Sequence, residues 1–82
     1  MLRIAHANAM NSFNSGKFKD AYAKFVEAAG RYDGHYLAAY WAGVAAHRLK
    51  KADESLQWMN RALAINPRYT PAAEYKSKKL KQ

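Results

Sequence analysis

Three histidines are the side chains of this sequence best suited to proton transfer or metal binding. His6, His35 and His47 are never four residues apart, so no two of them form the spaced pair that a helical zinc site uses. The fold could still bring His6 and His47 together. Two histidines without a nearby carboxylate make a poor metal site, however, and we interpret them as residues that line a surface.

Other catalytic signatures are absent from the sequence. It contains no H-E-x-x-H motif, no glycine-rich phosphate loop and no nucleophile elbow. We interpret Glu27, Asp53 and Glu54 as helix-surface or first-turn charges. The chain has no cysteine, which excludes disulfides, thiol catalysis and cysteine-based zinc sites. We therefore predict a protein that is not an enzyme and that uses no cofactor, no metal and no small-molecule substrate.

Length and composition predict one small domain over residues 1–82. Half of the residues are hydrophobic and 13% are aromatic, which is too apolar for a disordered segment. No stretch approaches the roughly 18 to 20 apolar residues of a membrane span. The N-terminal stretch is interrupted by His6 and Asn8, so we expect no secretory signal within it. Because the chain could be a piece of a longer protein, the compartment stays open.

The pattern of helix formers predicts an all-α fold. Five segments are rich in Ala, Lys, Leu, Met and Glu, and none alternates with period two: 3–14, 18–30, 36–49, 53–65 and 71–81. Three of the four glycines and both prolines lie between or at the edges of these segments. The connecting segments, near 15–17, 31–35, 50–52 and 66–70, are short, so neighbouring helices should run antiparallel.

The first and third predicted helices carry the same two stripes. One stripe consists of larger residues: His6, Met10 and Phe13 in the first helix, and Tyr40, Val44 and His47 in the third. The other consists of small residues: Ala5, Ala9 and Ser12 in the first, and Ala39, Gly43 and Ala46 in the third. A mid-helix glycine costs about 1 kcal/mol against alanine, so we expect Gly43 to allow a neighbouring helix to pack closely.

The second and fourth helices also share a pattern, displaced by 34 residues. Ala21, Phe25 and Ala28 correspond to Ser55, Met59 and Ala62. With the proline at Pro67, this pattern resembles the tetratricopeptide repeat family. The resemblance covers residues 2–69, with one repeat at 2–35 and a second at 36–69. It implies antiparallel helix pairs stacked in a right-handed superhelix.

The sequence departs from the family pattern at four positions. Ala5 and Ala39 stand where the family has a large residue, Asp33 stands where it has the terminal proline, and Lys50 replaces its turn glycine. The period and the pattern of the second and fourth helices remain.

Residues 70–82 are predicted to form a C-terminal capping helix. Thr70 is a candidate N-cap, with Pro71 at the first helical position. Ala73, Ser77 and Leu80 form a narrow stripe that should pack on the second repeat, while the rest of the segment is polar. Because repeat arrays generally need about three repeats, two repeats and a cap suggest a module of a longer protein, a homodimer, or a domain held by tight alanine packing. We favour the first.

The resemblance also implies a function. In the family, the inner face of the first helix of each repeat lines a concave groove that holds a peptide or a partner helix. Carried onto this chain, the groove residues are Arg3, His6, Met10, Phe13, Asn14, Leu37, Tyr40, Val44, His47 and Arg48. We therefore expect a non-enzymatic protein-interaction module that binds a protein or peptide partner. Some of these residues could instead pack on the cap or on a dimer mate.

The net charge of +8 leaves two other functions open. The basic run at Lys76, Lys78, Lys79 and Lys81 could meet nucleic acid or an anionic surface. The remaining basic residues are spread along the sequence and few aromatics interleave with them, so we expect nucleic acid not to be the partner. A basic surface does favour an acidic protein partner. A self-assembling, dimerising element is the third alternative.

Overall fold

The structure, a computed structural model, describes the backbone of residues 2–31 and 35–80 and the side chains of residues 8–31 and 35–80. Within these ranges the chain forms five α-helices and no strand, as the sequence predicted. The helices are α1 (Leu2–Asn14), α2 (Phe18–Arg31), α3 (Tyr36–Arg48), α4 (Ala52–Ile65) and α5 (Thr70–Lys79). Each predicted boundary is correct to within two residues. None of the described helices is long and apolar enough to cross a membrane.

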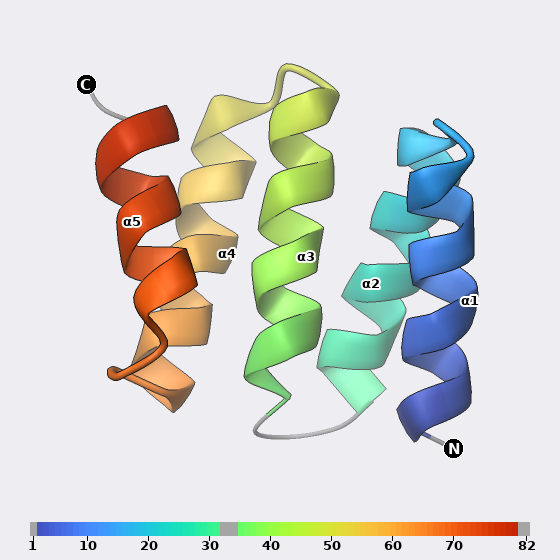
Figure 1. Cartoon of the computed structure of the whole chain (residues 1–82), viewed down its shortest axis with the longest axis horizontal. Coiled ribbons are helices and arrows are strands. Elements are labelled where there is room, and N and C mark those ends of the chain that lie inside the picture. The colour runs from blue at the N-terminus through green and yellow to red at the C-terminus, as the bar shows by residue number, and fades with distance from the viewer. Residues whose placement is uncertain (1, 32–34, 81–82) are drawn as a thin grey trace.

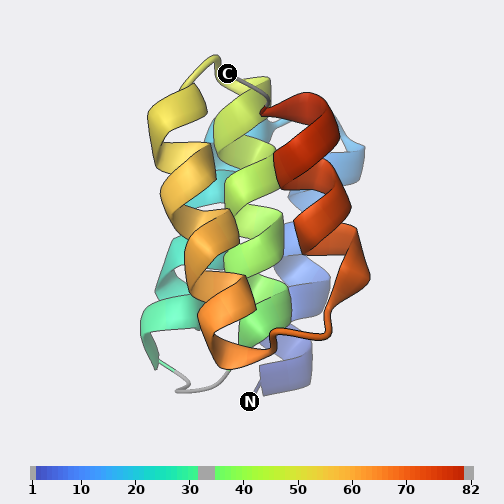
Figure 2. The ribbon, with the colours of Figure 1, turned by 90° about the vertical axis from the view of Figure 1, so that its left-hand side faces the viewer.

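The helices stand side by side and alternate in direction (Figure 1). The helices form two layers: α1, α3 and α5 make the front layer of Figure 1, and α2 and α4 make the back layer, which lies on the left in Figure 2. Each helix packs on the next along the chain, from α1 to α5. As a result, the α1–α2 turn, the α3–α4 turn and the C-terminal end of α5 all lie at the same end of the molecule.

The arrangement is repeat-like. The front-layer helices α1, α3 and α5 begin at residues 2, 36 and 70, and the back-layer helices α2 and α4 begin at residues 18 and 52. Each of α3, α4 and α5 therefore starts 34 residues after the preceding helix of its own layer. The fifth helix occupies the position of a third front-layer helix, with no described back-layer helix after it.

The core is built from the back-layer positions that share this spacing. The side chains of Phe25 and Met59 are both fully buried, as predicted. Phe25 packs against α1 and α3, and Met59 packs against α3 and α5. Gly43 allows α3 and α4 to approach closely: a Cβ atom there would lie 2.8 Å from Met59 Cε and 3.1 Å from the Ser55 carbonyl oxygen. The hydroxyl of Ser55 donates to the carbonyl oxygen of Gly43 at 2.6 Å. Close packing at Gly43 is thus confirmed.

The packing face of α5 differs from the predicted stripe. Leu80 is buried as expected, but Ala73 and Ser77 are exposed, and Ala72 is the residue that is fully buried. The reason is that α5 contacts α3 as well as α4, through the ring of Tyr75, which lies against His47. This second contact turns α5 so that the face carrying residues 72, 75 and 80 is directed inward.

The predicted cap of α5 is also wrong. Thr70 is the first helical residue, and Tyr69 occupies the N-cap position without a side-chain cap. The Tyr69 ring packs 4.9 Å from the ring of Tyr36 and 5.3 Å from that of Tyr40. We attribute the earlier helix start to this contact, which fixes the chain one residue before Thr70. Asp33, the family's proline position, lies outside the described residues.

Candidate functional site

The predicted groove residues of α1 are only partly within the described structure. Arg3 and His6 belong to α1, but their side chains lie outside the described residues. Met10 is half-buried and packs against the cluster that contains Ala9 and Phe25. Asn14, at the end of the helix, is exposed.

The predicted groove residues of α3 divide between core and surface. Val44 is 5% exposed and belongs to the core. Leu37, Tyr40 and His47 are half-buried, and Arg48 is exposed. Tyr40 and His47 both contact α5, so these two residues pack on the fifth helix, which is the alternative that the sequence analysis gave for some of the groove residues.

A continuous chain of ring contacts crosses the molecule from the start of α2 to the start of α5. Phe18 packs on Phe13 at 5.1 Å between ring centroids, and Phe13 packs on Trp41 at 5.5 Å. Trp41 lies 5.1 Å from Tyr40, which lies 5.3 Å from Tyr69. We call these five residues the aromatic row. All five are half-buried, so they join the helices and still present part of their surface to solvent.

Sequence reasoning missed most of this row, and it missed Tyr75. Only Phe13 and Tyr40 were among the predicted groove residues. The sequence pattern assigned no role to Tyr75, and it placed Tyr69 in the connecting segment at 66–70. The 34-residue spacing was a usable signal, because it places Tyr75 at the position that Trp41 has in α3.

Tyr75 forms a polar link to α3. Its hydroxyl oxygen lies 2.7 Å from Nδ1 of His47. Burial raises the pKa of the Tyr75 hydroxyl, while the nearby positive charge of Arg48 acts in the opposite direction. At neutral pH the phenol is therefore protonated and can donate to an unprotonated Nδ1 or accept from a protonated one.

An open hollow adjoins Tyr40 on the front layer. Its lining comes from α3 and α5: Tyr40, Pro71, Glu74, Tyr75, Lys78 and Lys79. Its volume of about 250 Å³ lies below the range of roughly 300–1,000 Å³ that is typical of small-molecule sites. The hollow therefore suits one inserted side chain better than a cofactor. Burial raises the pKa of Tyr40, which stays neutral at this site.

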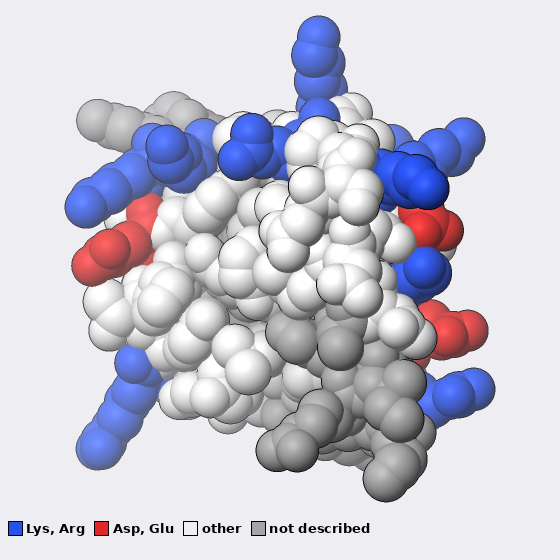
Figure 3. All heavy atoms as spheres, turned by 45° about the vertical axis from the view of Figure 1, so that its right-hand side comes forward, with Lys and Arg blue, Asp and Glu red and all other residues white. Residues whose placement is uncertain are grey.

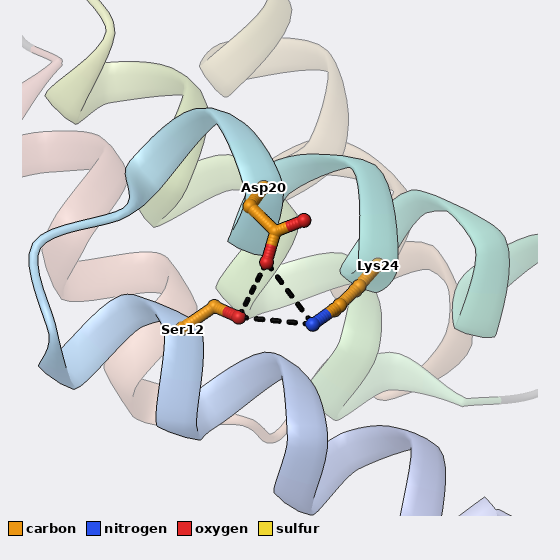
Figure 4. Close-up of polar contacts among 3 residues, drawn as sticks. All are labelled: Ser12, Asp20 and Lys24. Carbon is orange, nitrogen blue, oxygen red and sulfur yellow. Dashed lines mark hydrogen bonds and ion pairs between the residues drawn. The ribbon is translucent and has the colours of Figure 1, made fainter.

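Ser12, Asp20 and Lys24 are the described residues that come nearest to a catalytic arrangement (Figure 4). Ser12 Oγ donates to Asp20 Oδ2 at 2.6 Å, and Lys24 Nζ donates to Ser12 Oγ at 3.1 Å. Lys24 also forms an ion pair with Asp20 at 3.0 Å. A serine oxygen that accepts a bond from an ammonium group is a weaker nucleophile. Because the bonds connect α1 to α2, this triad orients the two helices rather than activating the serine.

A second polar network links the two back-layer helices. Tyr22 donates its hydroxyl hydrogen to Glu54 Oε1 at 2.6 Å and accepts from the indole Nε1 of Trp58 at 3.1 Å. Burial raises the pKa of Tyr22, and the bond to Glu54 raises it further. Glu54 is therefore more than a solvated first-turn charge, since it fixes α4 against α2.

The described residues contain no group of three or more His, Asp or Glu side chains placed to hold a metal ion. The class that the described structure defines is thus an all-α, repeat-like protein with an aromatic surface. Comparison with protein-family models, curated proteins and solved structures gave no match.

Proposed function

We propose that the chain is a tetratricopeptide-repeat-like interaction module, with two repeats and a capping helix in a right-handed superhelix. It binds a peptide or a helix of a partner protein on the surface formed by α1, α3 and α5. The common 34-residue spacing of the helix starts supports the repeat assignment. So does the burial of Phe25 and Met59 at equivalent positions.

The observation that carries the proposal is the half-buried Tyr40 beside the hollow. Aromatic residues are enriched at the cores of protein interfaces. Tyr40 stands where the aromatic row meets α5, and it lines a hollow that suits one apolar side chain. Lys78 and Lys79 border the same hollow. The partner segment therefore presents an apolar residue to Tyr40 and acidic residues to the lysines.

The function needs no catalytic group, cofactor, metal or small-molecule substrate. The chain works as one module of a longer protein, and a homodimer is the alternative way to complete a short array. In the homodimer, the same surface would be occupied by a second copy of the chain. Sedimentation of the isolated chain separates the two arrangements.

Peptide selection tests the proposal. Segments that bind the chain are selected from a random display library, and their dissociation constants are measured by calorimetry. Tyr40→Ala should weaken binding by about 30-fold or more, the effect of a central aromatic anchor. Tyr36→Ala is the matched control, because Tyr36 also packs on Tyr69 but does not line the hollow. It should leave affinity within a few-fold of the wild type.

Two further results would show whether the partner binds at the hollow. Lys79→Ala should change affinity by only a few tenths of a kcal/mol, about what a rim charge contributes. Equal losses for Tyr40→Ala and Tyr36→Ala, with both variants folded by circular dichroism, would contradict a binding site at the hollow. The assignment to this surface would then be withdrawn.

A further inference from the structure

A second surface adjoins the aromatic one and lies at the end of the molecule where three chain segments meet. The sequence suggested that the basic residues are spread out, yet the antiparallel helices gather many of them here. Six exposed lysines occupy this end: Lys17 and Lys19 near the α1–α2 turn, Lys50 and Lys51 in the α3–α4 connection, and Lys78 and Lys79 at the end of α5. We call them the basic end. Figure 3 shows Lys and Arg side chains gathered along the top of the molecule, where the basic end lies.

Side-chain contacts show that the three segments adjoin one another. The guanidinium of Arg48, at the end of α3, lies 5.7 Å from the centroid of the Phe18 ring, at the start of α2. The ammonium of Lys51 lies 5.8 Å from the centroid of the Tyr22 ring in α2. Leu49 shares one hollow with Lys17 and Lys19. The contact of His47 in α3 with Tyr75 in α5 brings the last part of α5 beside these segments, so the charges form a single surface.

The lysines outnumber the acidic groups at this end. The described carboxylates there are Asp20, Asp53 and Glu54, in the first turns of α2 and α4. Asp20 is already paired with Lys24, and Glu54 accepts the hydrogen bond from Tyr22. The basic end keeps a positive excess that its own side chains do not neutralise.

The shape of the surface matches a linear polyanion. The molecule measures 32 × 25 × 16 Å, and the helices run across its longest axis, so the end is a strip of about 32 by 16 Å. One strand of B-form DNA carries a phosphate about every 3.4 Å along its axis, so the strip spans roughly nine phosphates. Six lysines along that length can each contact one phosphate.

We propose that the basic end binds the phosphate backbone of a nucleic-acid strand without reading its bases. Lysine contacts phosphate as a point charge that needs no fixed geometry, which suits a backbone that is bound without reading its bases. Arg48, which is exposed at the end of α3, lies beside the six lysines and adds a further cation that can hold a phosphate. Base readout would require side chains on a helix or ribbon inserted in a groove, but these lysines project from turns and helix ends. Lys78 and Lys79 also border the hollow at Tyr40, so the two proposed surfaces meet at these lysines, whereas Lys17, Lys19, Lys50 and Lys51 belong to the basic end alone.

An anionic membrane is the less suitable partner. Membrane-surface helices add an exposed apolar face to their basic charges. Among the described residues the exposed large hydrophobic side chain is Ile65, in the last turn of α4 at the opposite end. At the basic end, the described large hydrophobic side chains Phe18 and Leu49 are half-buried and less available for insertion.

Fluorescence anisotropy with a labelled oligonucleotide of about 20 nucleotides tests the proposal, using the full chain. If six phosphates are contacted, the slope of log affinity against log salt should be about −4 for a single strand. Affinity should then fall by about 300-fold between about 50 and 200 mM salt. Changing the base sequence should alter affinity by no more than about two-fold.

A charge-matched pair of variants locates the site. Lys17→Gln/Lys19→Gln/Lys50→Gln removes three cations from the basic end and should reduce the slope by about two. Arg31→Gln/Arg61→Gln/Arg68→Gln removes three from the remainder of the surface and should leave the slope unchanged. The substituted lysines and arginines are all exposed, so both variants should fold.

Three outcomes would overturn the proposal. An equal reduction of the salt slope in the two triple variants would show that net charge alone is responsible for binding. Undetectable binding at about 50 mM salt would exclude nucleic acid. Tighter binding to phosphatidylserine vesicles or to polyglutamate than to the oligonucleotide would assign the basic end to a membrane or to an acidic protein instead.

Discussion

Nδ1 of His47 lies 2.7 Å from the hydroxyl oxygen of Tyr75, and this contact joins α3 to α5 across 28 residues of sequence. The two rings also meet edge to face, 5.5 Å apart between centroids. Because α5 packs less extensively on α4 than the other neighbouring helices pack on each other, this contact has a large share in fixing its orientation.

The Tyr75 hydroxyl should therefore stabilise the docking of α5. Tyr75→Phe keeps the ring and removes the hydrogen bond, which we expect to lower stability by about 0.5–1.5 kcal/mol. The change should be seen as a lower melting temperature and as faster amide hydrogen exchange in α5 than in α2. Identical exchange in α5 of the variant and the wild type would show that this bond does not hold the helix.

The two large buried back-layer side chains should dominate the stability of the core. Phe25→Ala should cost about 3–5 kcal/mol and Met59→Ala about 2–5 kcal/mol, because each leaves a cavity in a fully buried position. In a domain this small either change could abolish folding. Ile65→Ala is the control, since Ile65 is 37% exposed, and it should have a far smaller effect in urea unfolding. An unchanged midpoint for Phe25→Ala would contradict the packing described above.

Two glycines in helices should respond to alanine in opposite directions. A Cβ at Gly43 would lie 2.8 Å from Met59 Cε and 3.2 Å from Trp58 Cβ, so Gly43→Ala should destabilise by about 1–3 kcal/mol through overpacking. A Cβ atom at Gly30, in contrast, would have no neighbouring atom within 4 Å. Gly30→Ala should instead stabilise by up to about 1 kcal/mol through helix propensity. Thermal unfolding of both variants checks the sign, and a stabilising Gly43→Ala would show that α3 and α4 are farther apart.

The carboxylate of Asp20 should make stability depend on acidic pH. The hydrogen bond from Ser12, and after it the one from Lys24, hold the pKa of this carboxyl group below its usual range. A group whose pKa is lower in the folded state stabilises it above the unfolded pKa, and loses this effect as the pH falls through the folded value. The contribution should thus be complete above about pH 5 and disappear well below pH 4.

Carbon-detected NMR titration of the Asp20 carboxyl group measures this directly. Ser12→Ala removes the largest cause of the shift, so the pKa of Asp20 should move up toward its usual value. Asp20→Asn should unfold with a shallower dependence on pH between about pH 5 and pH 2 than the wild type. An Asp20 pKa that is the same with and without Ser12 would contradict the triad in Figure 4.

The sequence by itself determined the five helices and the two main core residues. Helical hydrogen bonds are local, so runs of helix formers with Gly and Pro at their edges locate the helices to within two residues. The repeated spacing of Phe25 and Met59 identified the buried positions, because a residue at a fixed place in equivalent helices meets equivalent neighbours.

Only the tertiary structure decided the face that α5 buries and the position of the lysines. The contacts of Tyr75 with His47, and of Tyr69 with Tyr36 and Tyr40, join residues that are distant in sequence, and no local pattern specifies them. Lys17, Lys50 and Lys78 are likewise far apart along the chain. They share one end because successive helices reverse direction, which brings every second turn to the same end of the molecule.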